Sequence, residues 1–184
     1  MRKLNVFNLV TLDGYFTGVG GDISWHRVDE EFRAIAVEKA CSGNTLLFGR
    51  VTYEMMYSYW TSPDGLKDDA EVARGMNASP KVVFSRTLRK ADWENTRLAR
   101  AGLLEDVRDL KKGSGKDLTV LGSGTIVAQL AEAGLVDEYQ TMLVPAALGR
   151  GRTMFEGVKR KLSFRLTGLR RFSNGNVLLT HVPE

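Results

Sequence analysis

Two patterns of apolar and polar residues alternate along the chain. Short apolar runs bounded by turn residues are typical of strands buried in a sheet, whereas apolar residues three and four positions apart indicate one face of a helix. The first pattern predicts strands over 3–10, 45–48, 81–85, 93–99, 138–145, 161–172 and 176–182, and a strand that leads into a turn over 117–124. The second predicts helices over 29–41, 52–60, 68–77, 103–112 and 125–134.

This order of elements predicts the fold class. Strands that alternate with helices favour a mainly parallel sheet covered on both faces. The last two strands are separated by Ser-Asn-Gly at 173–175, which indicates an antiparallel hairpin. We therefore expect a three-layer α/β/α fold with a mainly parallel central sheet and an antiparallel C-terminal hairpin. With 184 residues and no linker or repeat, the chain reads as one domain over 1–184.

Composition excludes several classes of protein. The apolar stretch near the N-terminus is interrupted by Asn5, Asn8 and Asp13, so it reads as a first strand rather than a signal peptide. No apolar run is long enough to span a membrane. A single cysteine, Cys41, and two histidines supply neither a disulfide framework nor a zinc site. We expect a cytoplasmic protein that holds no metal.

The charge of the chain is mildly basic, with a net charge of +4. Its basic residues are scattered, and the densest group lies in the last strands. A solvated basic face or a small anionic partner fits this distribution better than nucleic acid does.

The end of the strand over 45–48 has the features of an anion site. Gly49 allows a turn or a close approach, and Arg50 brings a permanent cation to that turn. Thr52 is expected to be the N-cap of the next helix. Because the N-terminus of a helix attracts anions, the segment predicts an anion cradle.

Two further strand ends have a similar character. Ser85 and Arg86 follow the strand over 81–85. The sequence Gly-Ser-Gly-Thr at 122–125 follows another strand and opens a helix, so its backbone N–H groups and hydroxyl suit a diphosphate. In an open α/β sheet, ligands bind at the carboxyl ends of the strands. Taken singly, the first motif also reads as a surface pair and the second as a plain tight turn.

The order of these motifs carries a family resemblance. The segments TLDGYFTG, LLFGRVTYE, KVVFSRTL, LGSGTI and LVDEYQTMLVPAALGRGRTMFEG resemble the dihydrofolate-reductase-like superfamily. They are more closely similar to stand-alone relatives of the reductase (RibD C-terminal) domain of bacterial riboflavin biosynthesis. The resemblance covers nearly the whole chain and implies NADPH as the cofactor, together with a homodimer.

The resemblance also implies which residues hold the cofactor. Its Gly-Arg-x-Thr motif for the cofactor phosphates matches Gly49, Arg50 and Thr52, and its Ser-Arg motif for the adenosine 2′-phosphate matches Ser85 and Arg86. A hydroxyl and a guanidinium suit that dianion. Its diphosphate loop matches Gly122, Ser123, Gly124 and Thr125. True dihydrofolate reductases have two adjacent glycines in this loop, whereas here Ser123 separates them.

The substrate side offers several candidate residues. Dihydrofolate reductases bind the substrate ring with an acid early in the first helix, after a Pro-Trp segment. This chain has Trp25 without the proline, followed by Asp29 and Glu30. Either acid could help protonate a ring, or could serve in ordinary helix capping. Asp13 is another candidate acid, with a turn before Gly14 as its alternative role.

A basic segment and a glycine-rich loop complete the predicted site. Arg150 and Arg152 lie between glycines and, by the resemblance, near the substrate, where they could meet a phosphate; the alternative is a flexible basic loop. Aromatic residues of the long loop over 11–27 could close over the cofactor or belong to the core. His26 could donate to a phosphorylated substrate or simply lie exposed in the loop.

The leading hypothesis is an NADPH-dependent reductase acting on a small pyrimidine- or pteridine-type substrate, as in riboflavin biosynthesis. One alternative is a true dihydrofolate reductase. Another is a non-catalytic nucleotide-binding or regulatory protein of the same fold.

Overall fold

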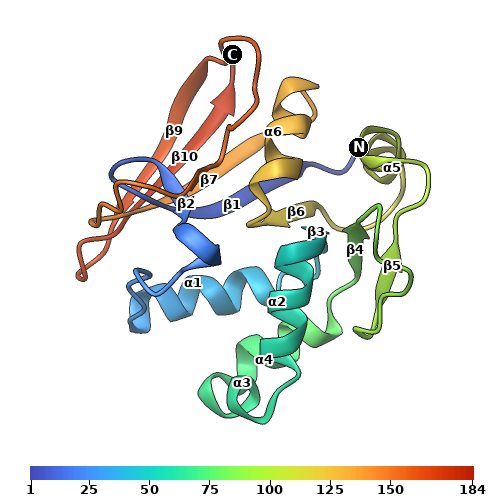
Figure 1. The fold of residues 1–184 in the computed structure, drawn as a ribbon, viewed down its shortest axis with the longest axis horizontal. Coiled ribbons are helices and arrows are strands. Elements are labelled where there is room, and N and C mark those ends of the chain that lie inside the picture. Colours follow the sequence, from blue (N-terminus) through green and yellow to red (C-terminus); the bar gives the residue numbers. More distant parts are fainter.

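A mixed sheet of eight strands forms the centre of the molecule, and the computed structural model describes all residues from 1 to 184 (Figure 1). The strand order is β5-β4-β3-β6-β1-β7-β10-β9. The first six strands in this order, from β5 through β7, are parallel to one another. Strand β10 runs antiparallel to both of its neighbours, β7 and β9. The bounds are β1 Leu4–Thr11, β3 Thr45–Gly49, β4 Lys81–Phe84, β5 Thr96–Leu98, β6 Leu118–Leu121, β7 Glu138–Val144, β9 Phe164–Arg171 and β10 Val177–Pro183. The predicted fold class is confirmed.

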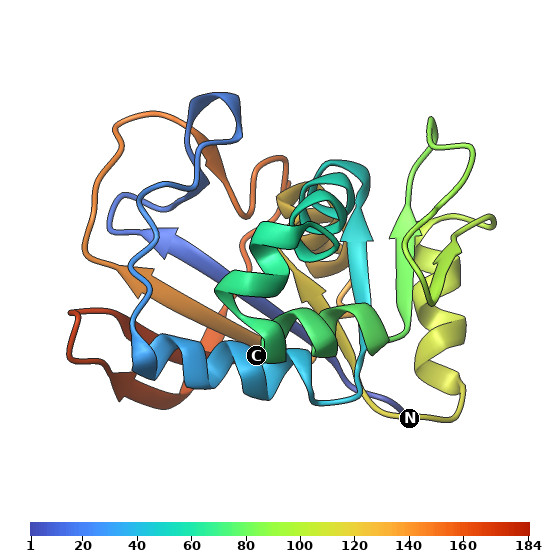
Figure 2. The same ribbon diagram turned by 90° about the horizontal axis from the view of Figure 1, so that it is seen from below.

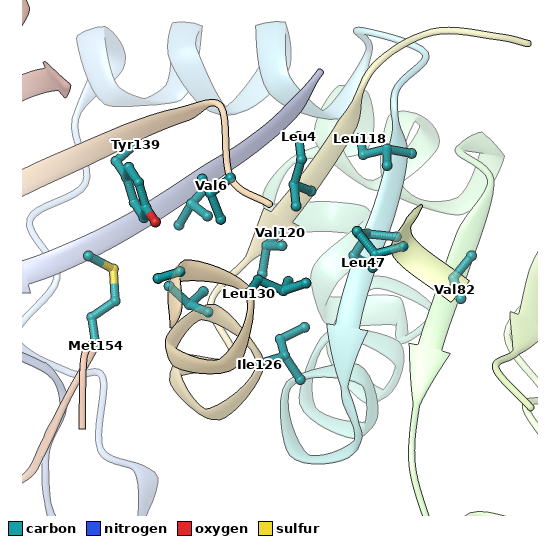
Figure 3. Close-up of a cluster of buried hydrophobic side chains, with 14 residues drawn as sticks. Leu4, Val6, Leu47, Val82, Leu118, Val120, Ile126, Leu130, Tyr139 and Met154 are labelled. Carbon is teal, nitrogen blue, oxygen red and sulfur yellow. The ribbon is translucent and has the colours of Figure 1, made fainter. Parts of the chain in front are cut away.

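Helices cover both faces of the sheet. Their bounds are α1 Glu30–Ala40, α2 Arg50–Trp60, α3 Pro63–Asp68, α4 Ala70–Ala78, α5 Leu103–Lys112 and α6 Gly124–Glu132. Helices α5 and α6 pack on one face, where Ile126 and Leu130 meet apolar side chains of β1, β3 and β6 (Figure 3). Helices α1, α2 and α4 pack on the other face, and Figure 2 shows α1 and α4 lying side by side.

A second, two-stranded sheet lies beside β1 of the main sheet. The long loop predicted over 11–27 contains β2, Tyr15–Thr17, and a 3₁₀ turn over Val19–Gly21. Strand β2 pairs antiparallel with β8, Arg152–Thr153. The backbone at Gly151 approaches Thr17 so closely that an added Cβ would lie 2.3 Å from the Thr17 carbonyl oxygen. Two segments far apart in sequence therefore form one unit.

The predicted helices differ from the observed ones in two places. The helix expected over 52–60 begins at Arg50, because Gly49 takes the extended N-cap conformation. The helix expected over 68–77 is α4, which begins at Ala70 because Asp69 caps it with its side chain, and the short helix α3 before it was not predicted. None of the helices combines the length and the apolar character that crossing a membrane requires.

Lys81 is a cation buried in the interior, with 1% of its surface exposed. Its Nζ donates to the carbonyl oxygens of Met76, Asn77 and Ser79 at 2.8, 3.1 and 2.7 Å. Burial lowers the pKa of Lys81 to about 8. These carbonyls end α4, so the ammonium group satisfies the helix C-terminus and suits its dipole. Lys81 therefore has a structural role.

Candidate active site

A cleft of about 1710 Å³ opens at the carboxyl ends of β1, β3 and β6. Its walls come from the starts of α1, α2 and α6, from the loop after β2, and from the segment that contains β8. The cleft brings together most of the residues predicted from sequence: Asp29, Glu30, Gly49, Arg50, Thr52, Gly122, Ser123, Gly124, Thr125, Arg150 and Arg152.

A hydrogen bond joins the two glycine turns, the one after β3 and the one after β6. Ser123 Oγ accepts a hydrogen bond from the Gly49 N–H at 2.8 Å. Gly122 has φ 63°, and a Cβ there would lie 3.2 Å from Cγ2 of Thr52. Ser123 itself has φ 64°, a left-handed conformation that is uncommon for residues other than glycine. The serine between the glycines thus joins the β6–α6 turn to the β3–α2 turn.

Both turns present the N-terminus of a helix to the cleft. The N-cap residues are Gly49 for α2, which has no side chain, and Ser123 for α6, whose side chain does not cap its helix. The prediction that Thr52 is the N-cap is wrong, because the helix begins two residues earlier. Uncapped N–H groups and the positive end of the helix dipole favour an anion at this point. Arg50 adds a half-exposed guanidinium, which pairs with Glu54 at 2.7 Å.

The β2–β8 unit lies over the N-terminus of α6. A Cβ on Gly124 would lie 2.5 Å from Cε1 of Phe16, so this ring rests directly on the glycine. Nη2 of Arg152 donates to Thr125 Oγ1 at 3.0 Å, and its Nε pairs with Glu156 at 3.2 Å. Arg152 therefore contacts the predicted diphosphate loop.

Ser85 and Arg86 lie outside the lining of the cleft, next to it. They follow β4, whose last residue, Phe84, pairs in register with Gly49 and does line the cleft. Ser85 Oγ accepts hydrogen bonds from the backbone N–H groups of Thr87 and Leu88 at 3.1 and 2.9 Å. The pair therefore lies at the same edge of the sheet as the predicted phosphate cradle.

The two acids at the start of α1 have different surroundings. Asp29 is half-buried, and its Oδ1 accepts a hydrogen bond from the Phe32 N–H at 2.8 Å, so it is the N-cap of α1. Glu30 is exposed in the first turn and lines the cleft. Of the two, Glu30 has the carboxylate that is not engaged by the helix cap.

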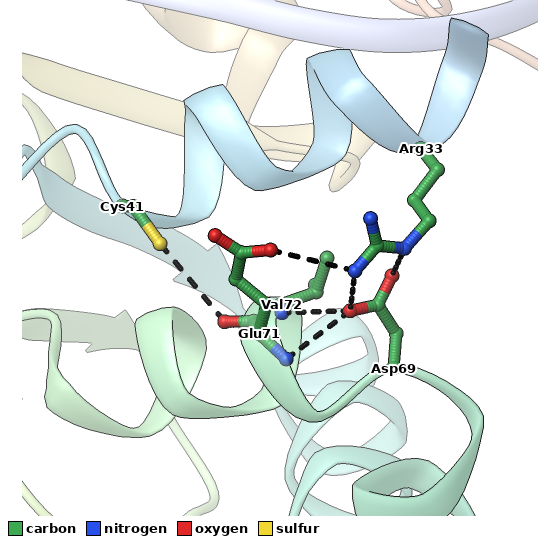
Figure 4. Close-up of polar contacts among 5 residues, drawn as sticks. All are labelled: Arg33, Cys41, Asp69, Glu71 and Val72. Atoms are coloured by element: carbon green, nitrogen blue, oxygen red, sulfur yellow. Dashed lines mark hydrogen bonds and ion pairs between the residues drawn. The ribbon is translucent and has the colours of Figure 1, made fainter. Parts of the chain in front are cut away.

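An apolar arm of the cleft extends between α1, α2 and α4. Its side chains are Phe32, Ala36, Met56, Trp60, Val72 and Met76. Arg33 borders this arm, where its Nε and Nη2 contact the Asp69 carboxylate at 2.7 and 3.1 Å (Figure 4). Sequence reasoning missed this pair, because Arg33 lies on α1 and Asp69 lies between α3 and α4, and no local pattern joins them.

The carboxylates of Asp69 and Glu71 both pair with the Arg33 guanidinium beside the apolar arm. Glu71 contacts Arg33 at 3.4 Å, and Asp69 accepts from the N–H groups of Glu71 and Val72. Burial raises the pKa of Asp69, but the Val72 N–H and the Arg33 guanidinium outweigh it and hold the pKa below its usual value. The hydrogen bond with Asp69 raises the pKa of Arg33. The cation therefore stays paired at neutral pH.

Asp13, one of the predicted catalytic residues, lies outside the cleft. Its carboxylate accepts from Thr11 Oγ1 at 2.6 Å and from the N–H groups of Leu148 and Gly149 at 2.9 and 2.7 Å. These hydrogen bonds lower its pKa, so the group is ionised at neutral pH. Asp13 anchors the loop after β7 rather than offering a proton.

Trp25 and His26 pack against each other in the loop after β2. The two rings meet edge to face at 4.5 Å, and Trp25 Nε1 donates to the Asp22 carbonyl at 3.2 Å. His26 lines the cleft, whereas Trp25 does not. Burial lowers the pKa of His26 to about 4, against the opposing charge of Asp22. An uncharged imidazole is a poor partner for a substrate phosphate.

Asn8 is a cleft residue that sequence reasoning missed. It lies on the central strand β1, is 3% exposed, and has no hydrogen-bond partner at either Oδ1 or Nδ2. Most buried polar groups are paired, so an unpaired amide in a cleft calls for an explanation. The signal in the sequence was an amide within the apolar strand NVFNLV.

Comparison with known proteins gives a consistent result. The RibD C-terminal domain family matches residues 2–178. The uncharacterized protein YyaP of Bacillus subtilis strain 168 is 28% identical over 180 residues, which cover 98% of this chain and 94% of that protein. Another uncharacterized protein of that organism, YwjB, is 22% identical over 190 residues, or 93% of this chain and 92% of its own.

Solved structures support the same fold. A protein of Shewanella sp. PV-4, provisionally assigned to riboflavin biosynthesis, is similar with a TM-score of 0.74 and 22% identity, over 100% of this chain and 99% of its own. A Thermotoga maritima diaminohydroxyphosphoribosylaminopyrimidine deaminase/5-amino-6-(5-phosphoribosylamino)uracil reductase gives 0.71 and 15% identity, over 100% of this chain and 57% of its own. At such identities these structures establish the fold alone. The family match over residues 2–178 shows that the chain belongs to the RibD C-terminal domain family, and the solved structures show its dihydrofolate-reductase-like fold.

Proposed function

We propose that this chain is an NADPH-dependent reductase acting on a pyrimidine- or pteridine-type heterocycle. The observation that carries the proposal is the joining of two uncapped helix N-termini, α2 and α6, by the Gly49–Ser123 hydrogen bond at the carboxyl edge of the sheet. A dinucleotide carries its negative charge in its phosphates, and such a site suits them. When bound, NADPH supplies the hydride, and the chain supplies position and charge.

The proposed cofactor site assigns a role to each turn. Gly124 and Thr125 would hold the diphosphate at the N-terminus of α6, and Arg152 would contribute its guanidinium from the β8 segment. Arg50 and Thr52 would hold phosphate at the N-terminus of α2. Ser85 and Arg86, beyond the next strand, would bind the adenosine 2′-phosphate and so select NADPH over NADH.

The substrate assignment follows the family. The Thermotoga maritima relative is named as a 5-amino-6-(5-phosphoribosylamino)uracil reductase, which makes a related pyrimidine the first substrate to test. Glu30 is the acid we assign to the substrate ring, and Arg150, which has no hydrogen-bond or ion-pair partner within the chain, is the cation we assign to a substrate phosphate. The homodimer implied by the family resemblance stays a prediction that light scattering would test.

A dihydrofolate reductase is the second candidate, and a specific observation favours it. The arm between α1 and α4 has apolar walls, and its cation Arg33 is already paired with Asp69. A flat pteridine ring suits such walls better than a sugar phosphate does. A screen should therefore include dihydrofolate beside ribosylamino-pyrimidines.

A titration of NADPH against NADH, followed by fluorescence, tests the cofactor half. We expect tight NADPH binding, weaker NADH binding, loss of both with Arg50→Ala, and loss of the NADPH preference with Arg86→Ala. Arg108→Ala is the matched control, since Arg108 is an exposed residue of α5, outside the cleft. If neither dinucleotide binds the wild type, the proposal is wrong.

Turnover is a separate question from binding. NADPH oxidation should be followed with each heterocycle in the presence of saturating cofactor, on the wild type and on Glu30→Gln. Binding of NADPH without oxidation by any pyrimidine or pteridine would support a non-catalytic nucleotide-binding protein instead. A loss of rate with Glu30→Gln, at unchanged cofactor affinity, would support the role assigned to this acid.

A further inference from the structure

The most unusual polar group in the molecule is the side chain of Asn8. It is 97% buried, lines the cleft, and leaves both Oδ1 and Nδ2 without a hydrogen-bond partner. Asn176, another buried amide with an unpaired oxygen, at least donates through Nδ2 to the Arg27 carbonyl at 3.0 Å. Burying an amide without partners opposes folding. A bound ligand that hydrogen-bonds to both Oδ1 and Nδ2 would explain why the Asn8 amide is buried without a partner in the chain.

The position of Asn8 indicates which part of a ligand it meets. Strand β1 lies between β6 and β7, and Asn8 is in register with Thr141. The preceding residue, Phe7, accepts a backbone hydrogen bond from Gly122 at 3.5 Å. Asn8 is thus immediately beside the Gly122–Ser123–Gly124 turn to which we assign the cofactor diphosphate. The nicotinamide, one ribose away from the diphosphate, falls within reach of this position.

The chemistry of the Asn8 amide limits which groups of a ligand can pair with it. A primary amide offers a donor and an acceptor side by side, and its complement is another amide edge, an N–H beside a C=O. The nicotinamide ring carries one carboxamide of this kind, and the lactam edge of a pyrimidine or pteridine is another.

We infer that Asn8 receives the carboxamide of the nicotinamide through a pair of hydrogen bonds and thereby fixes the orientation of the ring. This inference rests on the proposed function. It gives Asn8 a role in positioning the nicotinamide, and neither the glycine turns nor the acids of α1 fill that role. The same bond pair would fix which face of the nicotinamide is turned toward the substrate arm.

The test compares three ligands on wild type and on Asn8→Leu, a variant with the same number of side-chain heavy atoms and the same branching. The ligands are NADP⁺, its 3-acetylpyridine analogue, which replaces the carboxamide –NH₂ by a methyl group, and adenosine 2′,5′-bisphosphate, which lacks the nicotinamide. We expect the wild type to prefer NADP⁺ over the analogue by about tenfold, as for one well-made hydrogen bond. Asn8→Leu should lose this preference while its affinity for the bisphosphate stays unchanged.

The thermal midpoint of the ligand-free proteins gives a readout that does not depend on binding. Because the amide has no partner in the free protein, Asn8→Leu should melt at the same temperature as the wild type or above it. A lower melting temperature, or a loss of bisphosphate affinity, would show that Asn8 supports the fold and would overturn the inference.

The remaining outcomes separate this inference from the proposed function. If the wild type binds NADP⁺ and its analogue equally, the role of Asn8 is wrong and the reductase proposal stands. If Asn8→Leu changes only the KM of the heterocycle, the Asn8 amide hydrogen-bonds the lactam edge of the substrate and the nicotinamide assignment is wrong. If the wild type binds none of the three ligands, both proposals fail together.

Discussion

The two ends of the cleft are built from different kinds of structure. At the proposed cofactor end, turns directly after β3 and β6 are joined through the backbone of Gly49 and the hydroxyl of Ser123. At the apolar arm, by contrast, side chains of α1 and α4 meet, as Arg33 and Asp69 do. The first kind depends on short local segments and the second on how helices pack. The comparison predicts that changes at one end leave the other largely intact.

The largest effect is expected at Gly124. The Gly124→Val variant places a branched side chain where Cβ alone would lie 2.5 Å from the Phe16 ring. We expect NADPH affinity to fall on the order of 100-fold, equivalent to about 3 kcal/mol and to the upper range of overpacking costs. Fluorescence titration measures it, with Phe16→Ala as the control that removes the ring without filling the turn. A valine variant with wild-type affinity would separate this turn from the cofactor.

The loop that covers the cleft should respond to pH through His26. The pKa of His26 is about 4 in the folded protein, against an ordinary value of 6.5. Between these two pH values the unfolded chain therefore binds more protons at this histidine than the folded chain does. The free energy of unfolding should therefore fall as the pH drops from 7 to 5, by up to about 2 kcal/mol.

Urea unfolding at several pH values measures this slope. His26→Phe should flatten it, because the ring stays and the titrating group is lost. The matched control is His181→Gln, since His181 is the other histidine of the chain and lies on β10. A slope that survives in His26→Phe would place the titration elsewhere.

A smaller effect is expected at the bond that joins the two turns. Ser123→Ala leaves the Gly49 N–H without its acceptor, at a cost of about 1 kcal/mol in unfolding free energy. Ser123→Gly removes the same bond but relieves the left-handed backbone at φ 64°, so it should be the more stable of the two variants. Equal stability of the two variants would show that the backbone strain contributes little.

The smallest effect is expected at the apolar arm. Asp69→Asn removes the charge that pairs with Arg33 but keeps a side chain able to cap α4. Because the pair is partly exposed, we expect the KM for a heterocycle to change by only about threefold, with NADPH affinity unchanged. Steady-state kinetics measures both, and Glu71→Gln, at the longer 3.4 Å contact, should change less. A large loss of NADPH affinity would mean that the two ends are coupled.

The errors of the sequence interpretation follow from the same contrast. Thr52 was expected to cap a helix, but the extended Gly49 begins that helix earlier. Asp13 was a candidate acid and instead anchors a backbone loop. In each case the local residue types allowed several roles, and contacts distant in sequence selected one.

The sequence by itself determined the order of the main-sheet strands and of the longer helices, the fold class and the glycine turns after β3 and β6. These features depend on the local spacing of apolar residues and on backbone conformations that few residue types adopt. Only the tertiary structure decided that Ser123 joins the two turns, that Arg33 is neutralised by Asp69, and that Asn8 lies buried without partners. Those properties depend on which side chains the packing brings together, because burial and hydrogen bonding are set by neighbours far along the chain.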